Sequence, residues 1–183
     1  MNAIDILVAE HGLIRQFLDN LTTALGKMER GEKIPKTFFE HSVLFSRELV
    51  DKHHHFKEEL QMFTLLAQKH GGQFDTAIEG LRNQHENGRN HVAEIDYAKE
   101  GYEAGQESAT TTLPEHLDCY ISMLRQHINR EDHRLYPMAR EAYSAGEMEG
   151  LLVELQRADE KAGEGFFETN RDRVLKMGAL LNG

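Results

Sequence analysis

Two stretches of the sequence place a histidine four residues before a glutamate. One runs from His54 to Phe63, and the other, from His127 to Tyr136, repeats it in degenerate form. The aligned pairs are His54/His127, Lys57/Arg130, Glu58/Glu131, Glu59/Asp132, Met62/Leu135 and Phe63/Tyr136. Residues four apart lie on one face of a helix. Two helices that each direct a histidine and a carboxylate into a shared interior are a recurring way to bind a pair of transition metals.

The first stretch admits two registers, because His55 and Glu59 have the same spacing as His54 and Glu58. The registers differ by a rotation of about 100° around the helix, and the apolar positions do not decide between them. Only the register of His54 aligns Phe63 with the second aromatic residue. We therefore predict that His54 and Glu58 face the interior and that His53 and His55 either lie at the rim of the site or support its ligands.

Apolar residues that recur at steps of three and four predict an all-helical chain. The predicted helices cover residues 3–30, 36–69, 73–104, about 114–143, about 147–161 and about 166–181. The segment 108–112 is predicted to be a loop, and Pro137 is expected to kink the fourth helix near its end. The predicted fold class is all-α, with an up-down-up-down four-helix bundle over residues 1–145. Residues 146–183 are predicted to form a helical extension packed on the same domain.

The predicted helix lengths place several histidines at one height in the bundle. Antiparallel helices joined by a short turn bring together residues that are equally far from the turn. His11 and His54 meet this condition around the turn near Lys33, and Glu58 and His85 meet it around the next turn. At a rise of about 1.5 Å per residue, all candidates fall within one or two turns of a common level. The predicted layer comprises His11, His54, Glu58, His85, His127 and Glu131.

Four imidazoles and two carboxylates exceed the four positions of a tetrahedral zinc site. They suit two six-coordinate metals that share bridging carboxylates and keep positions open. Mixed imidazole and carboxylate ligation favours iron or manganese. The residues by themselves therefore predict a pair of iron or manganese ions.

Composition limits the class of partner and compartment. The chain has 183 residues and a net charge of −10, which argues against nucleic acid or an anionic membrane as a partner. The lone Cys119 is expected to be a buried small residue in a reducing compartment. The first residues lack the basic and apolar regions of a signal peptide, and we expect a cytoplasmic protein of undetermined oligomeric state.

These residues resemble the hemerythrin-like HHE cation-binding domain family. The matching motifs are Glu10-His11, His54-x3-Glu58-Glu59, Gln84-His85-Glu86 and His127-x3-Glu131-Asp132-x2-Leu135-Tyr136-Pro137. The resemblance covers about residues 3–140 and implies a four-helix bundle with a non-haem di-iron site that binds O2 or a related small ligand. Members include oxygen carriers and sensors of oxygen, iron or nitric oxide.

The sequence departs from the oxygen-carrying members on two helices. Their third helix carries His-x3-His, where this chain has Arg89 after His85. Their fourth helix carries His-x4-Asp, whereas Glu131 and Asp132 follow His127 at four and five positions. Either carboxylate remains a candidate ligand, and the repeat favours Glu131.

The expected function is that of a non-haem di-iron protein. It would bind or sense O2, NO or peroxide, or handle iron. A di-iron oxidase or peroxidase is one alternative, although such enzymes usually show Glu-x2-His spacing. A structural metal-binding bundle is the other.

Overall fold

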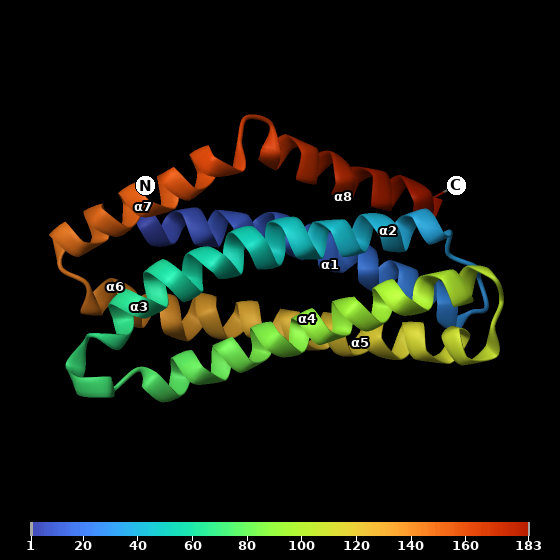
Figure 1. Cartoon of the computed structure of the whole chain (residues 1–183), viewed down its shortest axis with the longest axis horizontal. Helices are drawn as coiled ribbons and strands as arrows, with labels where there is room; N and C mark the ends of the chain where they lie inside the picture. Colours follow the sequence, from blue (N-terminus) through green and yellow to red (C-terminus); the bar gives the residue numbers. More distant parts are fainter. Residues whose placement is uncertain (1, 183) are drawn as a thin grey trace.

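The chain folds into four long antiparallel helices, with two further helices along one side (Figure 1). The computed structural model describes residues 2–182, and every regular element in that range is helical. The predicted all-α bundle with additional C-terminal helices is confirmed. The first and third bundle helices are α1 (Ala3–Glu29) and α4 (Asp75–Glu103). The Asn2 side chain caps α1 by accepting a hydrogen bond from the backbone N–H of Asp5.

The second and fourth bundle helices contain π turns, in which backbone bonds span one residue more than in an α-helix. The second comprises α2 (Lys36–Phe45), η1 (Ser46–His55), η2 (Glu58–Met62) and α3 (Phe63–Ala67). The fourth comprises α5 (Glu107–Arg130), η4 (Glu131–Leu135) and α6 (Tyr136–Ala142). The short turn η3 (His70–Gly72) connects the second bundle helix to α4.

The π turns η2 and η4 occupy equivalent positions of the internal repeat. Each begins at the repeated glutamate and ends just before the repeated aromatic residue. Pro137 is the second residue of α6, directly after Tyr136, and proline cannot donate the backbone bond of a regular helix. The kink expected at Pro137 stays a prediction; the π turn η4 immediately before α6 lies at the level of the His/Glu layer.

Two apolar clusters lie on either side of the His/Glu layer. The cluster toward the 31–35 turn includes Ile14, Leu18, Leu21, Phe38, Val50, Val92, Leu117 and Ile128. The cluster toward the opposite end includes Ile4, Leu7, Phe63, Ile78, Leu81, Leu135 and Leu155. Burial of this apolar surface is the main favourable contribution to folding. The polar layer is consequently enclosed between two hydrophobic cores.

The C-terminal helices pack against the first two bundle helices. α7 (Ala145–Ala162) runs along α1, and α8 (Phe166–Asn182) contacts both α1 and α2 (Figure 1). Ser144 caps α7 by accepting a hydrogen bond from the backbone N–H of Glu147. Each helix contributes apolar residues to one of the two clusters, and the extension is therefore part of the packed core.

The loop predicted over 108–112 is wrong, because α5 begins at Glu107 and Pro114 lies within it. Ala109 is buried against the core and draws this segment into the helix. Gly101 of α4 lets α5 pack close to α4, since a Cβ at this position would lie 2.9 Å from the Cβ of Ala109. Tertiary packing overrides weak local helix propensity at this corner.

Two further expectations concern the surface. Cys119 is exposed, which corrects its predicted burial. Between residues 2 and 182, the helices are too polar or too short to cross a membrane.

The packing of α7 predicts a large effect of truncating Leu155. This side chain is fully buried in the second cluster, whereas Leu175 on α8 is 62% exposed. Leu155→Ala should lower the free energy of unfolding by about 2–5 kcal/mol, because it removes buried methyl groups and leaves a cavity. Leu175→Ala should change it by no more than about 0.5 kcal/mol. Denaturant unfolding of both variants is the test, and equal effects would contradict this packing of α7.

Candidate metal centre

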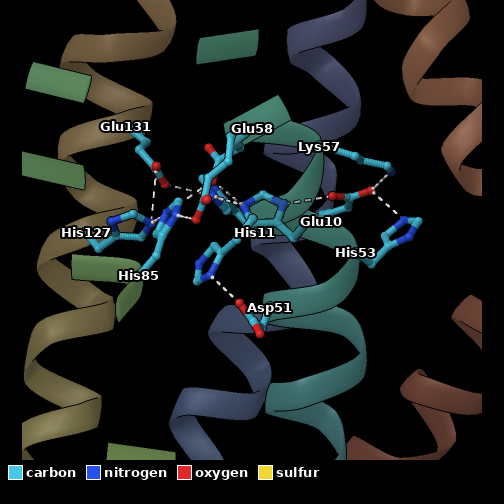
Figure 2. A network of polar contacts seen from close by, with 12 residues as sticks. Glu10, His11, Asp51, His53, Lys57, Glu58, His85, His127 and Glu131 are labelled. Carbon is cyan, nitrogen blue, oxygen red and sulfur yellow. Dashed lines mark hydrogen bonds and ion pairs between the residues drawn. The ribbon is translucent and has the colours of Figure 1, made fainter. Parts of the chain in front are cut away.

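The structure brings together all six residues of the predicted layer. His11, His54, Glu58, His85, His127 and Glu131 come from the four bundle helices, and none is more than 1% exposed. Figure 2 shows Glu58 and Glu131 directed toward the imidazoles between the helices. The common level inferred from helix lengths is therefore present in the fold. That these side chains ligate a metal remains a prediction.

The four histidines form two pairs of facing nitrogen atoms. The Nε2 atoms of His11 and His54 are 2.9 Å apart, and those of His85 and His127 are 3.1 Å apart. Glu131 reaches both pairs, with one oxygen 3.4 Å from Nε2 of His11 and the other 3.2 Å from Nε2 of His127. Each pair with its carboxylate marks one position for a cation.

Glu58 also reaches both pairs, through a single oxygen. Its Oε2 lies 3.8 Å from Nε2 of His54 and 3.5 Å from Nε2 of His85. Its other oxygen accepts a hydrogen bond of 2.8 Å from the hydroxyl of Tyr136. Both carboxylates are therefore placed to bridge two cations.

A closed cycle of hydrogen bonds orients the four imidazoles. In each bond the acceptor lies on the neighbouring bundle helix. Each acceptor is also the sequence neighbour of a predicted ligand. The bonds from Nδ1 to oxygen are His54 to Glu10 (2.8 Å), His85 to Glu59 (2.7 Å), His127 to Gln84 (3.2 Å) and His11 to Asp132 (2.9 Å). Metal-binding histidines usually donate their second ring N–H to a carboxylate or carbonyl oxygen in this way.

This cycle decides which ring nitrogen of each histidine carries the proton. An oxygen acceptor requires N–H at Nδ1, so a neutral imidazole has its lone pair at Nε2. The four Nε2 lone pairs then converge in the layer. Lone pairs that face each other at about 3 Å repel, and a cation between them turns this repulsion into attraction. The donor set thus fits metal ions.

The carboxylates lead to the same conclusion. Burial and the neighbouring charge of Glu58 raise the pKa of Glu131 well above its usual value. Both oxygens of Glu131 and Oε2 of Glu58 are buried without a hydrogen-bond partner within the described part of the chain. Buried carboxylate oxygens are normally paired. A bound cation would satisfy these atoms and keep both groups ionised.

Glu59 and Asp132, the alternative carboxylate ligands, have a different role. Each accepts a hydrogen bond from a site histidine and also pairs with an arginine. The hydrogen bond from His85 lowers the pKa of Glu59 to about 2. Both side chains are better placed to orient imidazoles than to replace Glu58 or Glu131.

The internal repeat also relates the first and third bundle helices. Comparison of the two His-x3-Glu stretches alone did not reveal this second relation. Glu10-His11-x3-Arg15 on α1 corresponds to Gln84-His85-x3-Arg89 on α4. Arg15 pairs with Asp132, and Arg89 pairs with Glu59. The repeated aromatics are placed equivalently, since Tyr136 stacks on His11 and Phe63 on His85. The centre therefore has approximate twofold symmetry in its residues.

His55 is buried against the layer, so a position at the rim is wrong, whereas the alternative, a group that supports the ligands, stays a prediction. Its ring stacks on that of His85 at 3.7 Å, and its ligand atoms lie within 4.8 Å of those of Glu58, His85 and His127. Regular α-helical geometry separates neighbouring residues by about 100°, which led to a choice between His54 and His55. The π segment η1 ends at His55, and both side chains are buried.

His53 points away from the layer, toward the C-terminal helices. The buried ammonium of Lys57 contacts Oε1 of Glu10 at 2.5 Å and also contacts Asp159 of α7, whose Oδ1 lies 3.0 Å from Nε2 of His53 (Figure 2). Glu10, His53 and Asp159 have the spacing of a cation site. Lys57 already supplies the positive charge there, so we do not assign a third metal.

Comparison with known proteins identifies the family. The hemerythrin HHE cation binding domain matches residues 2–139. The chain belongs to this family. Domains of the family bind metal cations, and the matched range contains every residue of the layer described above. The resemblance seen in the sequence motifs is confirmed.

Relatives of this chain are named only as uncharacterised proteins. An uncharacterised protein of Mycobacterium bovis and two of Mycobacterium tuberculosis are each 25% identical to this chain over 175 residues. The similarity covers 95% of this chain and 68% of each relative, so it includes the C-terminal helices. No solved structure gives a significant match.

The hydrogen-bond cycle predicts that Glu59 supports metal binding without ligating. Glu59→Ala should weaken metal affinity by about 10- to 100-fold, because the His85 ring loses the acceptor that orients it. Competition with a chromophoric chelator measures this affinity. Glu86→Ala is the matched control, since Glu86 also contacts Arg89 but is exposed. Equal affinities of the two variants would contradict the role given to Glu59.

Proposed function

We propose that this HHE domain holds two iron ions and binds or senses O2 or a related small ligand, NO or peroxide, or handles iron. The proposed ligands are His11, His54, Glu58, His85, His127 and Glu131. Manganese or zinc are alternative occupants. Cytoplasmic location is part of the proposal, because the exposed thiol of Cys119 suits a reducing compartment.

The observation that carries the proposal is the convergence of four imidazole lone pairs on two carboxylates. Two histidine pairs, each in reach of both Glu58 and Glu131, match two cations that share bridging ligands. A single zinc ion would use only four of these donors. Imidazole with carboxylate is a donor set that suits iron.

The two iron ions would supply redox chemistry and open coordination positions for the ligand. The chain's own residues would bind the ions and orient the side chains that ligate them. Tyr136 holds one oxygen of Glu58, so that only the other faces the histidines. The apolar clusters on either side of the layer shield it from water along the bundle, which strengthens each charge interaction inside. This arrangement favours binding of a small ligand over reaction with a large substrate.

Metal analysis tests the proposed function directly. The protein purified after growth with iron should contain two iron ions per chain and show charge-transfer absorption. Glu131→Ala should lose at least one of them, because it removes a carboxylate shared by both histidine pairs. His133→Ala, an exposed neighbour, should keep both. Iron content well below two in the wild-type protein would overturn the proposal, and turnover of peroxide with a reductant would favour the oxidase or peroxidase alternative.

Metal removal should destabilise the protein. Without cations, the layer buries unpaired carboxylate oxygens and opposed lone pairs. Metal at about 100 times its dissociation constant adds about 2.7 kcal/mol to stability, which corresponds to a rise of roughly 5–10 °C in Tm for a domain of this size. Calorimetry before and after chelation gives this difference. An unchanged Tm would indicate a bundle that does not depend on its metal.

A further inference from the structure

The repeat that relates the two halves of the centre is broken at two positions. Three residues after the aligned histidine, α1 has Ile14 and α4 has Gly88. One residue after the aligned histidine, the fourth helix has Ile128 and the second has His55. Ile14 and Ile128 are 0% and 2% exposed and belong to the apolar cluster. At this level the interface between α1 and the fourth bundle helix is therefore filled by apolar side chains, and the equivalent interface between η1 and α4 is not.

A cavity of about 460 Å³ lies at this second interface, between η1 and α4. Its inner wall includes His55, His85 and Gly88. Its outer part is lined by charged side chains that reach solvent, among them Arg47 and Arg89. The cavity extends from the surface to His55 and His85, and Gly88 keeps it open where the equivalent Ile14 fills space.

His55 at the inner end of this cavity has hydrogen-bonding capacity that the protein does not use. Both ring nitrogens are buried, and neither has a hydrogen-bond partner among residues 2–182. Its Nδ1 lies 3.9 Å from Oδ1 of Asp51, which is too far for a hydrogen bond. The four histidines of the cycle all have such a partner. A buried polar group without a partner is costly, so an incoming molecule that accepts a hydrogen bond would be stabilised here.

We propose that the small ligand reaches the centre through the cavity beside Gly88, occupies the His85/His127 side, and accepts a hydrogen bond from His55. This proposal rests on the proposed function, because it assumes that metal is bound. The ligand class is a molecule of two or three oxygen or nitrogen atoms with a free acceptor atom, such as dioxygen, nitric oxide or peroxide. His55 acts on the bound ligand and is not itself a metal ligand.

The access route is tested with azide as the probe, by stopped-flow absorption on the metal-loaded protein. Gly88→Ile introduces the isoleucine found at the equivalent position of α1. It should narrow the cavity and slow azide association at least 10-fold. Its matched control is Gly80→Ile on the same helix, which lines a different cavity and should leave the rate unchanged. A Cβ at Gly88 would lie 3.1 Å from Cε of Met123. Val92→Phe, on the same wall, replaces Gly88→Ile if that variant does not fold.

The role of His55 is tested by azide affinity together with metal content. His55→Phe keeps a ring stacked on His85 and should retain two metal ions per chain. It should weaken azide binding about 10-fold, the usual effect of losing one buried hydrogen bond. His55→Gln restores an N–H donor and should recover part of the affinity. His133→Phe is the exposed control.

Outcomes that contradict this proposal can be told apart from outcomes that contradict the proposed function. A His55→Phe protein that binds only one metal ion would make His55 a ligand and overturn this proposal, while the proposed function would stand. Unchanged azide affinity in His55→Phe, or an unchanged association rate in the blocked-cavity variants, would also overturn it. A wild-type protein that takes up no metal would overturn the proposed function and this inference together.

Discussion

The hydrogen bonds from Nδ1 of the four histidines are the constraint on which the rest of the centre depends. Each bond joins two neighbouring bundle helices, and together the four bonds connect all of them in a cycle. They fix the tautomer of every ring and direct all four Nε2 atoms inward. The bundle therefore cannot change its helix contacts at this level without turning a histidine. Ligand orientation and tertiary structure are set by the same interactions.

Such a layer is expensive to bury, and the surrounding fold offsets that cost. Apolar clusters on both sides provide most of the favourable free energy, while arginines hold Glu59 and Asp132 in their charged form. Among residues 2–182, five of the seven buried side-chain atoms without a hydrogen-bond partner belong to Glu58, Glu131 and His55, and the other two belong to His41 and Gln61. A few polar groups left without partners in an otherwise satisfied core are typical of a binding site. The distribution of satisfied and unsatisfied groups thus separates structural residues from those that face a ligand.

Much of the centre was predictable from the sequence, because α-helical spacing is regular. The repeat of His-x3-Glu and the equal distances from the turns were enough to place His11 and His85 beside the other candidate ligands. The π segments were not predictable in this way, since no simple pattern marks an i to i+5 turn, and so His55 was not placed in the layer. The orienting roles of Glu10 and Gln84 depend on contacts between helices. Their position beside the repeated histidines was nevertheless a visible signal.

The C-terminal helices contribute to the centre through Lys57. This buried ammonium contacts Asp159 of α7 and also Glu10, the acceptor that orients His54. Burial would raise the pKa of Glu10, but its contacts with His53 and His54 and the charge of Lys57 lower it well below the usual value. Removing one partner of such a buried network leaves an unpaired charge. The position of α7 and the orientation of His54 are therefore linked by two ion pairs, and a shift of either one alters the other.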